Sequence, residues 1–253
     1  MQFGFTSTSF RQIKSIERVT EIAVDTGSEC IEWGGDIHIK DINAAKEAKL
    51  LCDNKNIIIS SYGSYYRVGS KNSEEWQRIC EIASAMNANS IRVWLGKKDS
   101  EKTDDNTYKA LVEDAQAICG TAEKFNLKVC CECHDNTFNN NTDAFLRIHK
   151  DIGYDNFRTY FQSRYKRLQY DLDRIERTMP YIENIHISYS EQAREQFPLL
   201  KPDYIDKLLS KIISCGFNGN LLVEYTYLFS RAGIPSAMGK DISKIRTKVG
   251  ELK

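Results

Sequence analysis

The sequence has no excess of either charge and no long apolar segment. Basic and acidic residues are equal in number, at 35 each, so no overall positive field would gather a polyanion, and nucleic acid is not expected as a partner. No run approaches the roughly 20 apolar residues of a membrane helix. The amino terminus also lacks the basic and apolar regions of a signal peptide. These absences predict a cytoplasmic protein without a membrane partner.

Several common functional motifs are also missing. The chain has neither a Gly-rich nucleotide-binding loop nor a serine nucleophile elbow. Its eight cysteines lie inside periodic segments of a chain that is long enough to bury its own core, so we expect reduced thiols and no disulfide framework. No change of composition divides the 253 residues. A single domain over residues 1–253 is the expected organisation.

Short apolar runs alternate with amphipathic stretches along the whole chain, and we count eight of each. The sequence predicts strands at residues 2–6, 30–33, 57–61, 90–95, 128–133, 157–162, 184–188 and 221–225. This number, order and chain length are typical of an α/β fold with a single (β/α)8 TIM barrel. In such barrels, the residues at the carboxyl ends of the strands carry the chemistry.

The predicted strand at 128–133 ends in ionisable residues. Because side chains alternate along a strand, Cys130, Glu132 and His134 should face the barrel, while Cys131 and Cys133 face the helices. The cysteines therefore cannot converge on one metal ion. His134 is a candidate acid or base; alternatively, it is a loop histidine that bonds to its neighbour Asp135.

Two later predicted strands also bear one ligand-type residue each, His186 and Glu224. A carboxylate in a barrel interior is costly unless it is paired or bound to a metal, so Glu132 and Glu224 need partners. One interpretation is that each glutamate is solvated or forms a salt bridge. The other is that Glu132, His186 and Glu224 meet around a divalent cation at the barrel mouth.

These residues resemble the xylose isomerase-like TIM barrels, which include sugar and sugar-phosphate isomerases, epimerases, inosose isomerases, dehydratases and apurinic endonucleases. The resemblance spans nearly the whole chain, through the motifs Glu32-Trp-Gly-Gly-Asp36, Ile91-Arg-Val-Trp-Leu-Gly96 and Val223-Glu-Tyr225. It implies a cation such as Mn, Zn, Co or Mg, held by four strand-end ligands. Glu132, His186 and Glu224 match three of them.

The fourth family ligand is an aspartate, and Gln162 stands in its place here, with Tyr165 where the family has a histidine. A glutamine oxygen can coordinate a hard cation but carries no charge, so the cation should bind more weakly or the preferred metal should differ. Alternatively, the predicted strand at 157–162 is out of register.

The remaining candidates concern the substrate. Arg92, inward by parity, could bind a substrate oxygen or anion, or serve as the structural partner of Glu132. Trp33 and Trp94 could form apolar walls against a sugar ring; Trp94 shares the parity of Arg92, whereas Trp33 lies opposite Glu32 in parity and could instead pack outward. Glu32 is a candidate hydrogen-bond acceptor at the barrel mouth. The loop residue Lys98 extends the basic character of this face.

The resemblance implies an isomerase or epimerase of carbohydrate metabolism that acts on a small sugar, sugar phosphate or cyclitol. Glu132 and Glu224 would move a proton through an enediolate. Two alternatives stay open: a keto-sugar dehydratase or lyase on the same site, and a non-catalytic sugar-binding barrel with a degenerate metal site. Apurinic endonuclease activity does not fit four histidines. Barrels of this family are often dimers or tetramers, which implies a homo-oligomer.

Overall fold

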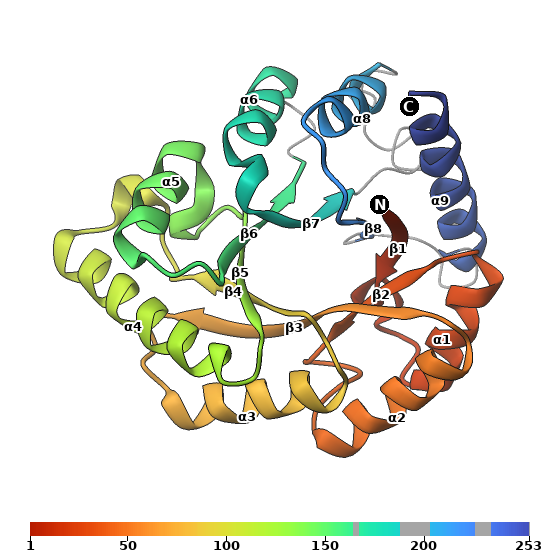
Figure 1. The fold of residues 1–253 in the computed structure, drawn as a ribbon, viewed down its shortest axis with the longest axis horizontal. Helices are drawn as coiled ribbons and strands as arrows, with labels where there is room; N and C mark the ends of the chain where they lie inside the picture. The colour runs from red at the N-terminus through yellow and green to blue at the C-terminus, as the bar shows by residue number, and fades with distance from the viewer. Residues whose placement is uncertain (164–166, 188–202, 226–233, 253) are drawn as a thin grey trace.

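The chain forms a closed barrel of eight parallel strands with helices around it (Figure 1), which confirms the predicted (β/α)8 fold. The computed structural model describes residues 1–163, 167–187, 203–225 and 234–252. The strands are β1 (Gln2–Thr6), β2 (Cys30–Gly34), β3 (Ile58–Val68), β4 (Ser90–Leu95), β5 (Lys128–Glu132), β6 (Phe157–Gln162), β7 (Ile182–Ile187) and β8 (Asn220–Val223). β1 pairs with β2 and β8, which closes the barrel.

Helices cover the outside of the barrel. They are α1 (Ile16–Asp25), α2 (Ile42–Asn54), α3 (Ser73–Ala85), α4 (Asp105–Glu123), α5 (Thr142–Ile152), α6 (Leu168–Thr178), α8 (Tyr204–Ser214) and α9 (Ile234–Glu251). Five of them begin at a polar side chain that accepts a backbone N–H of the first turn, at Ser15, Asp41, Asn72, Asp104 and Asn141. Within the described ranges, no helix has the length and apolar character that crossing a membrane requires.

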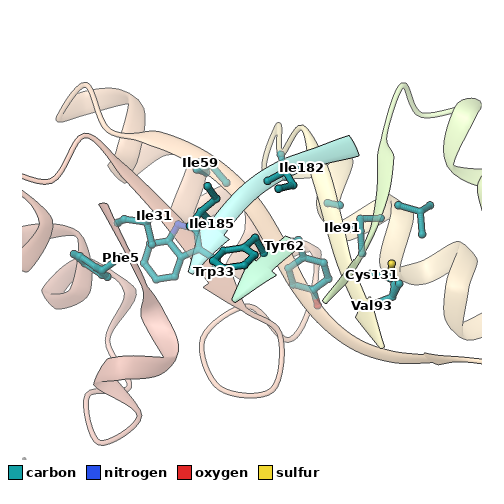
Figure 2. Packing of buried hydrophobic residues seen from close by; sticks show 14 of the residues in the cluster. Phe5, Ile31, Trp33, Ile59, Tyr62, Ile91, Val93, Cys131, Ile182 and Ile185 are labelled. Carbon is teal, nitrogen blue, oxygen red and sulfur yellow. The ribbon is translucent and has the colours of Figure 1, made fainter. Parts of the chain in front are cut away.

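The main apolar core lies between the barrel and the helices. Side chains on the outward faces of the strands fill it, as Figure 2 shows for Phe5, Ile31, Ile91, Val93 and Ile185, among others. Since alternate residues point to opposite faces, these positions leave the other half of each strand for the barrel interior. The eight cysteines are free thiols, as expected, and seven of them are buried.

The barrel interior is more polar than the outer core. Asn184 donates through Nδ2 to the hydroxyl of Tyr160 at 2.6 Å and accepts from Nδ2 of Asn220 at 2.6 Å. These side chains lie in the middle of β6 and β7 and at the start of β8, deeper in the barrel than the strand ends. These side chains form a hydrogen-bonded layer inside the barrel, below the carboxyl ends of the strands.

Strand boundaries agree with the sequence to within two residues except at the end of β3. β6 spans the predicted residues, so its register is confirmed. β3 extends to Val68, seven residues beyond the predicted end, and its pairing with β4 shifts register between Gly63 and Arg67. Tyr65 lies in that irregular segment with φ of 61°. The irregularity breaks the alternation that marks a strand in a sequence, which is why the prediction stopped short. β7 begins at Ile182, and its predicted last residue, Ser188, lies outside the described residues.

Candidate active site and metal centre

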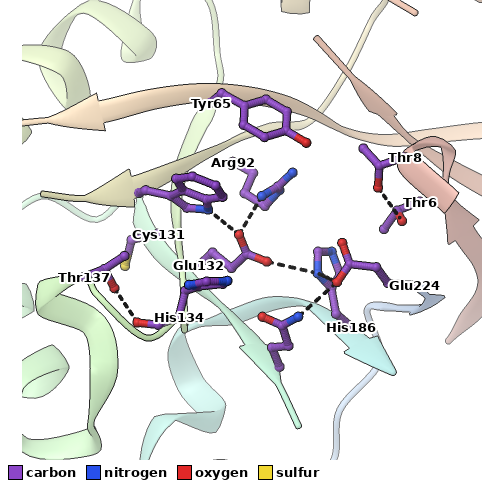
Figure 3. A network of polar contacts seen from close by, with 12 residues as sticks. Thr6, Thr8, Tyr65, Arg92, Cys131, Glu132, His134, Thr137, His186 and Glu224 are labelled. Atoms are coloured by element: carbon purple, nitrogen blue, oxygen red, sulfur yellow. Dashed lines mark hydrogen bonds and ion pairs between the residues drawn. The ribbon is translucent and has the colours of Figure 1, made fainter. Parts of the chain in front are cut away.

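Three ionisable side chains converge at the carboxyl ends of the strands (Figure 3). Glu132 is the last residue of β5, His186 lies in β7, and Glu224 follows β8 directly. One potential ligand atom from each residue lies within 4.8 Å of the others, and all three side chains are buried. The barrel therefore brings together the three residues that the sequence singled out as metal ligands.

The two ring nitrogens of His186 have different surroundings. Nε2 lies 3.4 Å from Oε2 of Glu32. Nδ1 lies 3.4 Å from Oε1 of Glu132 and 3.5 Å from Oε2 of Glu224, yet it is buried and makes no hydrogen bond with the described residues. An unsatisfied imidazole nitrogen that faces two carboxylates is a donor set suited to a divalent cation. The side chains thus fit a metal ion between Nδ1 and the two glutamates.

The surrounding carboxylates favour the protonated form of the histidine in the metal-free protein. Burial disfavours the imidazolium, but the carboxylates of Glu224 and Glu32 outweigh burial and raise the pKa of His186 well above 6.5. A metal needs the neutral imidazole, so a bound cation would take the place of this proton.

Arg92 resolves one alternative that the sequence left open. Its Nε donates to Glu32 at 3.0 Å and its Nη1 to Glu132 at 2.5 Å, and all three side chains are at least 97% buried. The indole Nε1 of Trp94 donates to the same oxygen of Glu132. Burial alone would raise the pKa of Glu132, but the Arg92 guanidinium reverses this and lowers it well below 4.5. Arg92 is therefore the structural partner of both glutamates.

This ion pair predicts an acid-sensitive metal-free protein. Burial would raise the pKa of Glu32, but Arg92 and then His186 lower it from 4.5 to about 2. Because the folded-state pKa is the lower one, the carboxylate stabilises the fold above about pH 4.5, and this contribution is lost as the pH falls toward 2. We expect the free energy of unfolding to fall by on the order of 3 kcal/mol in this window. Urea titrations at stepped pH would measure it, and an equal loss in Glu32→Gln would contradict the assignment.

Glu132 and Glu224 line a pocket of about 280 Å³, and His186 lies fully buried beside them. Six of its lining residues are Arg92, Trp94, Glu132, His134, Gln162 and Glu224, all of them candidates from the sequence. The other four, which the sequence analysis missed, are Thr8, Arg11, Tyr65 and Tyr225. They come from segments that follow β1 and β8 and from the irregular part of β3, where no strand-end pattern marks them.

Tyr65 is the most informative of the missed residues. Its ring packs edge-on against Trp94 at 5.4 Å between centroids, and the Arg92 guanidinium lies 5.3 Å from its ring centre. Arg11 donates to its hydroxyl at 2.5 Å. A tyrosine with positive φ is uncommon and persists only where its surroundings hold it. The available signal in the sequence was composition and not alternation, because the adjacent aromatic residues Tyr65 and Tyr66 favour a strand.

His134 both bonds to Asp135 and lines the pocket, so the structure combines the two interpretations of this residue. Its Nδ1 lies 2.7 Å from the backbone oxygen of Asp135, and a carbonyl oxygen only accepts, so Nδ1 carries the proton. In the neutral ring, Nε2 is then the acceptor nitrogen. The ring stacks on Trp94 at 5.5 Å with an angle of 29° between the planes. This contact fixes the orientation of the imidazole.

Gln162 ends β6 and lies beside Glu224, as the alignment with the family aspartate requires. Its Nε2 donates to Oε2 of Glu224 at 3.0 Å. Its Cα partner across the sheet is His186. The amide thus lies beside the cluster, where the resemblance predicts a fourth ligand, and it adds no charge. Tyr165, at the place of the family histidine, lies outside the described residues.

Gln162→Asp should tighten divalent cation binding by about 10-fold or more, because it adds a charged oxygen ligand. Calorimetric titration with Mn²⁺ would measure the change. The Gln162→Asn variant is the matched control, since it shortens the side chain equally without adding charge. Equal affinities in the two variants would contradict the assignment of Gln162 to the metal centre.

Three predicted substrate contacts do not lie in the pocket. Glu32 is 1% exposed and lies behind Arg92, where it also accepts from the Ser61 hydroxyl at 2.8 Å. Trp33 has no exposed surface and packs edge-on against His38 in the core outside the barrel. Lys98 is exposed and lines a different pocket. Strand parity explains the outward position of Trp33, and the depth of Glu32 below the strand ends follows from its pairing with Arg92.

A family model described as a xylose isomerase-like TIM barrel matches residues 20–228. The 3-dehydroshikimate dehydratase of Bacillus anthracis is 21% identical in an alignment of 205 residues. This alignment covers 76% of this chain and 73% of that protein. The solved structure of a probable 3-DHS dehydratase from the same organism has a TM-score of 0.77 at 16% identity and covers 98% of this chain and 99% of its own.

Sugar epimerases have the same fold. A D-psicose 3-epimerase structure determined with D-fructose has a TM-score of 0.80 at 14% identity, over 99% of this chain and 100% of its own. The structure of the 3-keto-D-glucoside 4-epimerase of E. coli has a TM-score of 0.76 at 14% identity, over 98% of this chain and 99% of its own. At such low identities, these likenesses show the shared fold. Because the family model spans most of the chain and the barrel agrees with it, the chain belongs to the xylose isomerase-like TIM barrel family.

Proposed function

We propose that this protein is a metal-dependent isomerase or epimerase that moves a proton beside the carbonyl of a small sugar or cyclitol. The observation that carries the proposal is the buried cluster of Glu132, His186 and Glu224, whose ligand atoms lie within 4.8 Å of one another, with both glutamates lining the pocket. The unbonded Nδ1 of His186 supports a cation there. A volume of about 280 Å³ suits a small ligand, since drug-sized pockets start near ~300 Å³.

The two glutamates differ in their surroundings, and this suggests different roles. Glu132 is held by Arg92 and Trp94 with a strongly lowered pKa, so it is a poor proton acceptor and suits a permanent ligand. Glu224 accepts one neutral hydrogen bond, from Gln162. We assign proton removal to Glu224 and proton return to Nε2 of His134, which also lines the pocket and would act in its doubly protonated, charged form. A bound cation would stabilise the negative charge that develops on the substrate oxygens.

A dehydratase is the second candidate, and the curated relative with that activity favours it. Elimination begins with the same proton removal by the same base. The two reactions diverge afterwards: in the dehydratase, a hydroxyl group one carbon further along leaves as water, so the proton is not returned to carbon. His134 would then protonate the departing hydroxyl group.

Metal content is the first measurement, on protein purified without chelator or added metal. The protein is then loaded separately with Mn²⁺, Mg²⁺, Co²⁺ or Zn²⁺ and incubated in D2O with ketoses and inososes. Proton NMR of the substrate would report exchange. Deuterium uptake with a new diastereomer or isomer supports the isomerase or epimerase, and a conjugated enone that absorbs in the ultraviolet supports the dehydratase. A protein that neither binds metal nor exchanges protons contradicts the isomerase or epimerase and the dehydratase. The non-catalytic sugar-binding barrel is then the remaining interpretation.

A further inference from the structure

We propose that a second pocket, beside the candidate active site, binds a small anion of the phosphate monoester class. This pocket of about 310 Å³ lies between the end of β3, the loop after β4 and the first turns of α4. Three cationic side chains line it, Arg67, Lys97 and Lys98, and none of its lining residues is acidic. Ser70, Thr103 and Thr107 line it as well, although the hydroxyls of Thr103 and Thr107 already donate to the backbone oxygen of Asp99 and to Asp104. The cationic side chains are therefore the groups that would bind a phosphate.

Arg67 is the central group of this basic pocket. Its Nη1 donates to the backbone oxygen of Gly96 at 2.8 Å, and it forms no ion pair with a carboxylate of the described residues. Burial lowers its pKa, and no acidic group opposes that effect, in contrast to Arg92, whose pKa the facing glutamates raise. A partly buried guanidinium without a carboxylate lacks a counter-charge. An anion in the pocket would supply one.

The two lysines are free of ion pairs with the described carboxylates in the same way. Lys98 interacts electrostatically with Asp104. The Asp104 carboxylate caps α4 and already accepts hydrogen bonds from the backbone N–H and the hydroxyl of Thr107. Lys97 and Lys98 are both exposed, so their ammonium groups can turn toward a ligand. The net charge of the lining is therefore positive.

The frame of the basic pocket is fixed before any ligand binds. The backbone N–H of Gly96 donates to the oxygen of Val68 at 3.2 Å, which ties the loop after β4 to the end of β3. Gly69 and Gly96 have φ of 94° and 68°, and a Cβ on either would come within 3.1 or 3.2 Å of Leu111. Only glycine allows both loops to close on α4 in this way. A rigid frame reduces the entropy that a ligand loses on binding.

Trp94 connects the two pockets. The Arg67 guanidinium lies 4.1 Å from the ring of Trp94, whose indole N–H donates to Glu132 in the active-site pocket. His134 stacks on the same indole. An anion that binds Arg67 should therefore perturb the environment of Trp94. The phosphate could belong to the substrate or to a separate ligand, and the chemistry of recognition is the same in both cases.

The indole N–H signals of the three tryptophans give a direct test, recorded by NMR on metal-free protein that carries ¹⁵N-labelled tryptophan. Inorganic phosphate is added at constant ionic strength, with chloride as the balancing anion. We expect a saturable shift of the Trp94 signal, while Trp33 and Trp76, both buried in the outer core, stay unchanged. Replacing Lys97 and Lys98 by glutamine should weaken phosphate binding by about 10-fold. The matched control replaces Lys46 and Lys55, which are exposed on and just after α2.

Two results would overturn the proposal: no saturable shift of Trp94 at millimolar phosphate, or an equal weakening in the control variant, which would indicate general screening. A second titration with D-fructose 6-phosphate and D-fructose distinguishes the sources of the anion. Displacement of inorganic phosphate by D-fructose 6-phosphate but not by D-fructose is expected, and a failure of the sugar phosphate to displace it would contradict the phosphate monoester class. If the sugar phosphate binds clearly more tightly than inorganic phosphate, its sugar adds contacts and the anion belongs to a substrate; equal affinities support a separate ligand. Since neither titration needs metal or turnover, their failure would leave the proposed reaction untouched.

Discussion

Glu224→Gln should lower turnover by about 10³-fold or more while the barrel stays folded, because it removes both a proposed base and a charged metal ligand. The amide has almost the same size and can still bond to Gln162. In the metal-free protein, the variant loses the attraction of Glu224 to His186 together with its repulsion from the neighbouring carboxylates, so its melting temperature should change little. Steady-state kinetics on the substrate identified by proton exchange, together with a thermal melt, would measure both effects.

Glu183→Gln is the matched control for that variant. Glu183 lies near the start of β7, away from the strand ends that form the site, and its carboxylate pairs with Lys128 at 2.7 Å. The control should keep its turnover and lose a modest amount of stability, because it breaks a partly exposed ion pair. A clear drop in the melting temperature of metal-free Glu224→Gln would instead identify Glu224 as a structural ion-pair partner and contradict its proposed role.

Arg92→Met should lower the free energy of unfolding by about 3–5 kcal/mol, since it leaves Glu32 and Glu132 buried without their cation. The three side chains are almost completely buried, so water cannot replace the lost contacts. Urea denaturation of the metal-free protein would measure the change. Arg92→Lys provides a folded reference: it keeps the charge but cannot bond to both glutamates with a planar fork, so its loss should be smaller.

A double variant separates the ion pair from simple packing. Adding Glu32→Gln to Arg92→Met removes one of the stranded charges, so the second change should recover part of the stability that the first one lost. If the two changes instead add independently, the Arg92–Glu32 contact contributes no coupling, and the structural role assigned to Arg92 is wrong. Added Mn²⁺ should also rescue Arg92→Met in part, because a cation at Glu132 compensates the same charge.

Glu132 and Glu224 have different hydrogen-bond partners, so their side chains are not equivalent in the site. Glu132 is fixed by Arg92 and Trp94, and Trp94 in turn lies between His134 and Arg67. The same indole therefore borders the proposed metal ligand, the proposed proton donor and the basic pocket. A change of ligand in either pocket would be transmitted through side chains that are already in contact.

The fold and the metal cluster were predictable because both follow from local patterns. Alternation along a strand decides which residues face the barrel, and this holds whatever the neighbouring strands are. It placed Glu132 and His186 inside, and Glu224 directly follows its strand. It also gave the register of β6, and with it the place of Gln162, even though Arg158 and Tyr160 made that strand look unusual. Tyr160 is accommodated by its bond to Asn184 in the polar interior.

Predictions about substrate contacts were less accurate, because they depend on distances between strands. Lys98 follows β4 closely, yet its loop turns toward α4 and a different pocket. Arg11 and Tyr65 reach the active-site pocket from segments that carry no strand-end pattern. Such positions are set by loop conformation and by an irregular strand, for which one sequence carries only weak signals.

By itself, the sequence determined the barrel, the order of its strands and the residue types at their carboxyl ends. Only the tertiary structure decided how those residues share their charges. Arg92 could have faced a substrate or a glutamate, and parity allowed both; closure of the barrel brought it within 3.0 Å of Glu32 and 2.5 Å of Glu132. The reason is physical: periodicity fixes the direction of a side chain, but the partners of a buried charge are fixed by which strands become neighbours in space, and burial makes those partners obligatory.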